Sequence, residues 1–287
     1  MKYVIITPVN NEELYIRLTL DSIVAQTVRP EQWIIVDDGS TDDTAKIIQE
    51  YVTRYAWIKQ VTLPVGYRRE LGAKVVQVFY EGYKSLDVDY DFLVKLDADL
   101  SFEPDYFERL LGKFTEDSRL GIAGGGCFIL VGDQWRLEKN PIDHVRGATK
   151  VYRKACFNEI GGLQLVNGWD GIDEWRAQMK GWKTHSFNEL IIHHLRPTGA
   201  YYGKWRGYCK EGEDAFFLGY PWLIILARSL YHALSERPPL IMGAGIFWGY
   251  LRSWLARKPQ FGDTELIAFI RHKQMRRILF FWHSDSW

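Results

Sequence analysis

Cysteine is scarce in this chain: Cys127, Cys156 and Cys209 are its only three in 287 residues. Their odd number and wide spacing exclude a disulfide framework and a C-x-x-C zinc site, and they favour a reducing compartment. Net charge is absent too, because 36 Lys and Arg residues balance 36 Asp and Glu residues. A balanced chain has no overall attraction to the phosphates of DNA or RNA, so we expect no nucleic-acid partner.

Long hydrophobic runs are also missing. Ala215–Ala227 and Pro238–Leu251 are uncharged for 13 and 14 residues, short of the ~20 that span a bilayer. Residues 215–287 carry nine Lys or Arg against four Asp or Glu and are rich in Trp. Two interpretations stay open: a helical hairpin packed on the rest of the protein, or helices lying in the lipid headgroup layer. We favour the second, which predicts a membrane surface as partner and a location at the cytoplasmic face of a membrane or in the cytoplasm.

Strand and helix patterns alternate through the first half of the chain, which predicts an α/β fold with a mainly parallel sheet flanked by helices. Beyond Gly124-Gly125-Gly126 we expect an irregular binding region over 125–172, then a short helix and a strand at 190–194. The predicted domains are 1–214 and a helical region, 215–287. The expected strands are Tyr3–Thr7, Trp33–Val36, Ile58–Leu63 and Phe92–Leu96, and the expected helices begin after a cap at Asn10 or Asn11, after Ser40, near Glu70 and at Pro104.

Two carboxylates follow the fourth expected strand, in the sequence Lys95-Leu96-Asp97-Ala98-Asp99. Ligands of open α/β sheets gather at the carboxyl ends of the strands. Asp97 and Asp99 are spaced to hold Mg²⁺ or Mn²⁺ there, although a solvated turn has the same pattern. Strand alternation predicts that Lys95 is structural and points away from the two acids.

Three further motifs lie near expected strand ends: Pro8-Val9-Asn10-Asn11-Glu12-Glu13, Asp37-Asp38-Gly39-Ser40-Thr41-Asp42, and Asn167-Gly168-Trp169-Asp170-Gly171-Ile172-Asp173. With the Asp97–Asp99 pair, their order and spacing resemble those of the family 2 glycosyltransferases, which have the GT-A fold. The resemblance covers about residues 1–200. It implies that Pro8, Asn11 and Glu12 line a nucleoside pocket and that Asp38 contacts the base or ribose. Asp97 and Asp99 would hold the metal that bridges the diphosphate of the donor.

The resemblance also implies a carboxylate that acts as general base on the acceptor hydroxyl. Aligned with the G-W-G-G-E-D pattern of the family, Asp173 takes the base position, and Asp170 is the second choice. Ile172 stands where the pattern has Glu, and Asp173 has the alternative role of a helix N-cap. Trp169 is expected either to stack on an acceptor sugar or to belong to the core.

Basic residues and histidines complete the expected site. His193 and His194 end a strand, and related enzymes place a histidine there as a metal ligand or diphosphate contact. Since neighbours on a strand face opposite ways, one is expected to reach the metal, and we favour His194. Arg196 would pair with phosphate oxygens, its alternative being a surface ion pair. Gly72 and Lys74 are candidate nucleotide contacts.

These expectations combine into one function. The resemblance implies a metal-dependent, inverting glycosyltransferase that uses a nucleoside-diphosphate sugar, with UDP-sugar favoured. The acceptor would be a saccharide or a lipid-linked saccharide, and the product would enter cell-surface polysaccharide or glycolipid. Two alternatives remain, a nucleotidyltransferase and a catalytically inactive membrane-bound scaffold. The acidic, amide-rich segment after Ile6 counts against the first, since a triphosphate calls for a basic, Gly-rich loop there.

Overall fold

The computed structural model describes residues 1–64, 74–138, 140–166, 168–196, 204–235 and 240–279. Contacts divide the chain into two compact units, Met1–Pro197 and Thr198–Trp287. The division falls before the predicted boundary at 214, because helix α7 (Lys204–Phe217) packs on α9 (Ile241–Leu255) in the second unit. The contact is close: a Cβ atom added to Gly212 would lie 2.0 Å from the carbonyl oxygen of Ile246.

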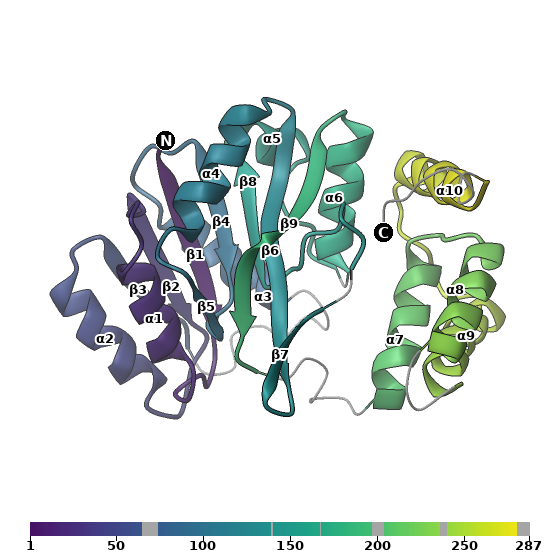
Figure 1. Cartoon of the computed structure of the whole chain (residues 1–287), viewed down its shortest axis with the longest axis horizontal. Coiled ribbons are helices and arrows are strands. Elements are labelled where there is room, and N and C mark those ends of the chain that lie inside the picture. Colours follow the sequence, from purple (N-terminus) through teal and green to yellow (C-terminus); the bar gives the residue numbers. More distant parts are fainter. Residues whose placement is uncertain (65–73, 139, 167, 197–203, 236–239, 280–287) are drawn as a thin grey trace. The chain divides into compact units, whose positions relative to one another are not determined.

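The first unit is built on one mixed sheet with the strand order β3-β2-β1-β4-β8-β6-β9-β5, and β7 pairs with β6 (Figure 1). Its described strands are β1 Tyr3–Val9, β2 Gln32–Asp37, β3 Ile58–Thr62, β4 Phe92–Leu96, β5 Leu100–Phe102, β6 Leu120–Val131, β7 Gln134–Leu137, β8 Thr149–Arg153 and β9 Lys183–His194. Its described helices are α1 Ile16–Val24, α2 Thr44–Arg54, α3 Lys74–Lys84, α4 Tyr106–Glu116, α5 Lys154–Glu159 and α6 Trp169–Met179.

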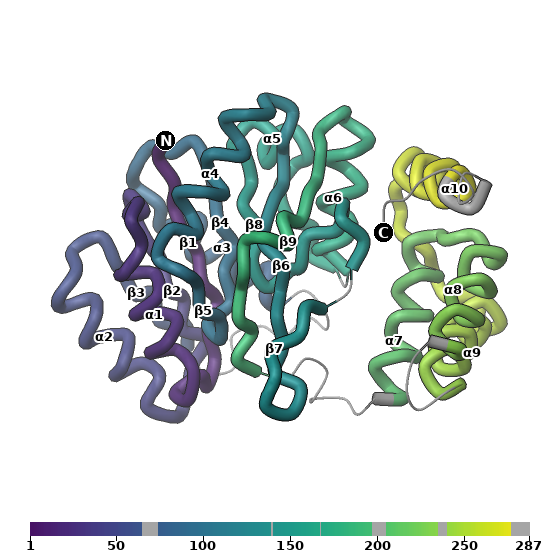
Figure 2. The backbone as a smooth tube through the Cα atoms, in the orientation of Figure 1, coloured from purple at the N-terminus to yellow at the C-terminus, as the bar shows by residue number. Residues whose placement is uncertain are grey.

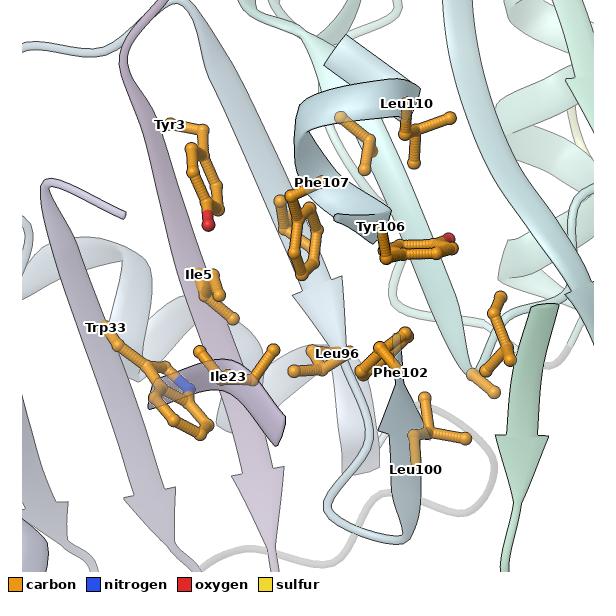
Figure 3. Close-up of a cluster of buried hydrophobic side chains, with 14 of the residues drawn as sticks. Tyr3, Ile5, Ile23, Trp33, Leu96, Leu100, Phe102, Tyr106, Phe107 and Leu110 are labelled. Carbon is orange, nitrogen blue, oxygen red and sulfur yellow. The ribbon is translucent and has the colours of Figure 1, made fainter. Parts of the chain in front are cut away.

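Strands β3, β2, β1 and β4 run parallel, as the sequence predicts. Strands β1, β2 and β4 are mostly apolar and buried because helices cover both faces, whereas the edge strand β3 is mixed in polarity and only half-buried. One core holds Val94 and Leu96 with residues of α1, α2 and α4, and Figure 3 shows Tyr3 stacked on Phe107 within it, with ring centroids 5.0 Å apart. The opposite core holds Leu93 and Trp169 with residues of α3, α5 and α6. Side-chain alternation along each strand therefore decides in which of the two cores a residue packs.

The prediction of an irregular region over 125–172 is wrong. The three glycines continue strand β6, and β7, β8 and α5 follow, with β8 antiparallel between β4 and β6. The glycines do not form a turn but allow neighbouring backbone to come close. A Cβ on Gly125 would lie 2.1 Å from the carbonyl oxygen of Leu190. The backbone path from β6 through the β7 hairpin can be followed in Figure 2.

Three predicted helix starts also differ from the structure, and one of them is α4, which begins at Tyr106 instead of Pro104. Helix α1 begins at Ile16, so neither Asn10 nor Asn11 is its cap. Helix α2 begins at Thr44, because the residues after Ser40 first form a loop. The asparagines bind that loop, as described below.

The second unit, taken by itself, is helical. Besides α7 and α9, it contains α8 (Trp222–Ser235) and α10 (Thr264–Leu279). The uncharged stretches of the sequence fall mostly in α8 and α9. Among the described helices, none combines the length and the apolar character that crossing a bilayer requires.

Candidate active site

The loops after β1 and β2 bind each other at the carboxyl edge of the sheet. The Asn10 side-chain amide donates to the carbonyl oxygen of Asp38 (2.7 Å), and the Asn11 side-chain oxygen accepts from the Thr41 amide (2.8 Å). The Asn11 backbone amide donates to the Ser40 hydroxyl (3.0 Å). These reciprocal bonds satisfy backbone groups beyond the strand ends and hold the first two motifs together.

The predicted nucleoside contacts lie at this edge. Pro8 is paired with Val36 in the β1–β2 ladder, and the Glu12 amide donates to Thr44. Asp38 is buried, and the ammonium of Lys74, at the start of α3, forms an ion pair with its carboxylate. Two residues predicted separately as donor contacts are thus brought together by the fold. Gly72 lies outside the described residues.

Lys95 does not point away from the acids, and that prediction is wrong. Its buried ammonium donates to the Asp97 carboxylate and to the carbonyl oxygen of Gly147 (2.7 Å). Strand alternation has a period of two residues, so Lys95 and Asp97 belong on the same face, and alternation in fact favours this contact. The long lysine stem then reaches the carboxylate beyond the strand end.

Asp99 lies among three groups from distant parts of the chain. The His194 Nε2 atom is 3.4 Å and the Arg196 Nε atom 3.5 Å from the Asp99 Oδ2 atom, and Arg196 also pairs with Glu12. Pairing of β5 with β9 places Leu100 opposite His194, which brings the histidine to Asp99. Burial raises the pKa of the Glu12 carboxyl to about 7; the negative charge of Asp99 acts in the same direction, and Arg196 opposes it.

The two histidines face opposite ways, as strand geometry predicts. His194 lies beside Asp99, whereas the ring of His193 packs on Trp135 with centroids 4.4 Å apart. Within the described part of the chain, no three His, Cys, Asp or Glu side chains converge as a metal-binding group. Asp99 and His194 nonetheless fit one divalent ion, because Mg²⁺ sites of this kind use one or two protein ligands and substrate phosphates.

Asp173 is not a helix N-cap. Helix α6 begins at Trp169, where Gly168 provides the left-handed backbone (φ 74°), so Asp173 lies in the second turn. It is 1% exposed, and the ammonium of Lys150 lies 2.9 and 3.1 Å from its carboxylate oxygens. The Tyr152 hydroxyl donates to the same carboxylate, and Glu174 is 2.9 Å from Lys150. Burial acts to lower the pKa of Lys150, but Asp173 and Glu174 more than offset it, so that pKa is raised.

Asp170 lies one turn earlier and is partly exposed. Its carboxylate is against the backbone of Gly147: a Cβ added there would lie 2.8 Å from the Asp170 Oδ2 atom. The Gly147 carbonyl in turn accepts from Lys95, which binds Asp97. The structure therefore brings Asp170 close to the Asp97–Asp99 motif through one contiguous set of contacts.

Trp169 is 8% exposed and belongs to the core between the sheet and α6. The ammonium of Lys95 lies 5.3 Å and that of Lys150 lies 5.7 Å from its ring centroid. These two lysines are direct cross-strand partners in the β4–β8 ladder. Burial of Trp169 favours its role in the core over sugar stacking, because its ring is already engaged in cation–π contacts with the two ammonium groups.

Sequence reasoning missed Lys150, Tyr152 and Glu174. The signal lay in Thr149–Arg153, where Lys150 interrupts an otherwise strand-like run. A lysine inside a buried strand requires a carboxylate partner, and Asp173 and Glu174 were available.

Comparison with known proteins identifies the family. Residues 4–165 match the model of glycosyl transferase family 2, more than half of the chain, and the chain belongs to that family. Glycosyltransferase GlyA of Streptococcus pneumoniae is 30% identical over 118 residues, covering 40% of this chain and 15% of that protein. A poly-beta-1,6-N-acetyl-D-glucosamine synthase of Staphylococcus epidermidis is 29% identical over 205 residues, covering 65% and 46%. The chain thus spans less than half the length of these relatives.

Solved structures agree on the fold. TarS 1-349 of S. aureus in complex with UDP-GlcNAc superposes with a TM-score of 0.56 at 14% identity, covering 96% of this chain and 81% of that one. A mannosyltransferase of Pyrobaculum calidifontis in complex with GDP-Man and Mn²⁺ gives 0.55 at 14% identity, covering 98% and 81%. The chain belongs to glycosyl transferase family 2 and has the GT-A fold, as predicted, and the family assignment replaces the nucleotidyltransferase alternative.

We expect Lys150→Met to lower the free energy of unfolding by about 3–5 kcal/mol, because it leaves two buried carboxylates without their cation. Urea denaturation followed by tryptophan fluorescence measures this. Lys154→Met is the matched control, since Lys154 pairs with Asp89 at the surface, and it should leave stability unchanged. Equal stability of Lys150→Met and wild type would contradict the role given to the buried ion pair.

Proposed function

We propose that this protein is a metal-dependent, inverting glycosyltransferase that uses a nucleoside-diphosphate sugar, with UDP-sugar favoured. The proposal rests chiefly on the convergence of Glu12, Asp99, His194 and Arg196 at the carboxyl edge of the sheet, next to the Asp38–Lys74 pair. Acidic and imidazole ligands beside basic side chains suit a metal-bound diphosphate, and the buried Asp38 suits a nucleoside. The staphylococcal relative is named as a synthase of poly-beta-1,6-N-acetyl-D-glucosamine, which supports polysaccharide synthesis. The proposed acceptor is a saccharide or lipid-linked saccharide, and the product enters cell-surface polysaccharide or glycolipid.

In this proposal Asp99 and His194 would hold Mn²⁺ or Mg²⁺ beside the phosphates of the donor. When bound, the metal supplies a Lewis acid that offsets charge on the departing diphosphate. Asp97, held by Lys95, lies beside this site. When the donor binds, the Arg196 guanidinium exchanges its pairing with Glu12 for a pairing with the phosphate oxygens, whose geometry its planar group matches.

Asp170 is the proposed general base, in place of Asp173. Asp173 is fully buried and its carboxylate is engaged by Lys150 and Tyr152, which leaves it no route to an acceptor. Asp170 is partly exposed and lies against Gly147, near the metal motif. It takes the proton of the acceptor hydroxyl as that oxygen bonds to the anomeric carbon, while the bond from that carbon to the diphosphate oxygen breaks.

We expect Asp99→Ala to weaken Mn²⁺-dependent nucleotide binding by at least about tenfold, through loss of a metal ligand. Calorimetric titration of UDP and of GDP, with and without Mn²⁺, measures the affinity and names the donor class. Asp105→Ala, which removes a surface carboxylate beside Arg109, is the control and should bind like wild type. If wild type binds neither nucleotide, or if Asp99→Ala binds as tightly as wild type, the donor site is wrongly placed.

We expect Asp170→Asn to lower kcat by about 10²–10⁴, because proton transfer contributes that much in general base catalysis. Nucleotide affinity should stay unchanged, since Asp170 acts on the acceptor side. The rate is measured as release of the nucleoside diphosphate from the donor that calorimetry identifies. A variant that keeps the wild-type kcat would remove Asp170 from the mechanism.

The membrane surface remains part of the proposal. On α8, Trp222, Leu226, Leu230 and Leu234 recur every four residues, and their exposed fractions are 62%, 37%, 56% and 83%. This spacing places them on one broad apolar face of the helix. The same unit carries basic side chains on α9 and just beyond it, Arg252, Arg257 and Lys258. An apolar face in a basic unit suits the headgroup layer of an anionic bilayer at the cytoplasmic face.

We expect the protein to sediment with vesicles of phosphatidylglycerol and phosphatidylcholine. The double variant Leu230→Glu/Leu234→Glu should stay in the supernatant, because it places charge on the face proposed to enter the headgroup layer. Leu18→Glu alters a half-exposed leucine of α1 in the catalytic unit and is the control. Failure of the wild-type protein to sediment would end the membrane proposal without affecting the donor site.

A further inference from the structure

The β6–β7 hairpin presents a tryptophan to solvent. Trp135 is 40% exposed and is paired with Leu130 across the hairpin. One side of its indole packs on His193, with the ring planes 49° apart, and the ring of Phe128 lies 6.5 Å from His193. The indole is therefore held in place from behind, while part of its surface stays open.

Trp135 lies on the face of the sheet that carries α6. Cys127 and Ile192 point into the core under α1, α2 and α4. Their neighbours Phe128 and His193 consequently face the opposite side, where Trp169 packs under α6. Since Trp135 contacts His193, it projects on the same side of the sheet as Asp170.

The hairpin is also tied to the loop that contacts Asp170. Glu138 follows β7 directly, and its carboxylate lies 2.8 Å from the Nε atom of Arg146. The next residue, Gly147, touches the Asp170 carboxylate. The hairpin is thus connected to the proposed base through Glu138, Arg146 and Gly147.

We propose that Trp135 is an acceptor-binding residue on whose open face a pyranose ring of the acceptor saccharide stacks. This inference rests on the proposed function and names a subsite of it. An indole face is electron-rich and attracts the polarised C–H groups on the flat side of a sugar ring. Because His193 already holds the indole, little side-chain freedom is lost on binding. Trp135 takes the role that Trp169 cannot fill, since the ring of Trp169 is occupied by Lys95 and Lys150.

The test uses the full-length protein with saturating UDP and Mn²⁺. We first measure binding of the protein to an immobilised panel of hexose and N-acetylhexosamine oligosaccharides. Calorimetry then gives Kd for the saccharides that bind. Trp135→Ala and Trp135→Leu should each weaken binding by about tenfold, which corresponds to ~1.4 kcal/mol. Trp135→Phe keeps a ring and should retain most of the affinity. Val131→Ala changes a neighbouring exposed residue that alternates to the other face of the hairpin, and it should bind like wild type.

UDP affinity separates the two proposals. It should be equal in all variants, which shows that each is folded. The subsite is disproved, and the donor site stands, if wild type binds UDP but none of the saccharides. The same holds if Trp135→Ala and Trp135→Leu bind the saccharides as tightly as wild type does. If wild type binds no nucleotide, the proposed function itself fails. Loss of vesicle sedimentation in Trp135→Ala with unchanged saccharide binding would assign the indole to lipid and also overturn the inference.

Discussion

Two buried lysines that oppose each other across one strand pair are the constraint on which this site depends. Lys95 and Lys150 are cross-strand partners, and like charges in that relation repel unless they are compensated. The structure places the Trp169 ring against both ammonium groups and gives each its own carboxylate partners. Helix α6 must therefore dock on β4 and β8 with its first two turns in place, and this docking positions Asp170 beside Gly147.

The same constraint distributes the acidic residues of the site among different tasks. Asp173 and Glu174 are occupied in neutralising the buried Lys150. Asp97 neutralises Lys95 in the connection between β4 and β5. Asp99, two residues further along the same connection, faces His194 at the end of β9 and Arg196 just beyond it. Family 2 membership and the GT-A fold set the class of reaction, and this division of carboxylates is what assigns roles to individual residues in the proposal.

Much of the parallel half was predictable, because its strands are apolar runs and its motifs follow them directly. The antiparallel half was not. Gly124–Gly126 resembled a break, yet Gly125 and Gly126 are needed where β6 meets β9 too closely for a Cβ atom, and Gly124 is needed against Val145 and Thr149. Alternation correctly separated His193 from His194. The prediction for Lys95 was wrong because residues 95 and 97, two apart, share a face of the strand. Asp173 matched a capping pattern, and only the left-handed Gly168 places the helix start earlier.

The sequence by itself determined the family, the α/β class, the parallel strands and the set of acidic motifs, because these depend on local patterns and on spacing along the chain. Tertiary structure decided which carboxylates are open and which are neutralised, since that depends on contacts between β4, β8 and α6 that lie far apart in sequence. It also decided which tryptophan is buried and which is exposed. A tryptophan has the same sequence signal in a core and in a saccharide site, and only packing distinguishes Trp169 from Trp135.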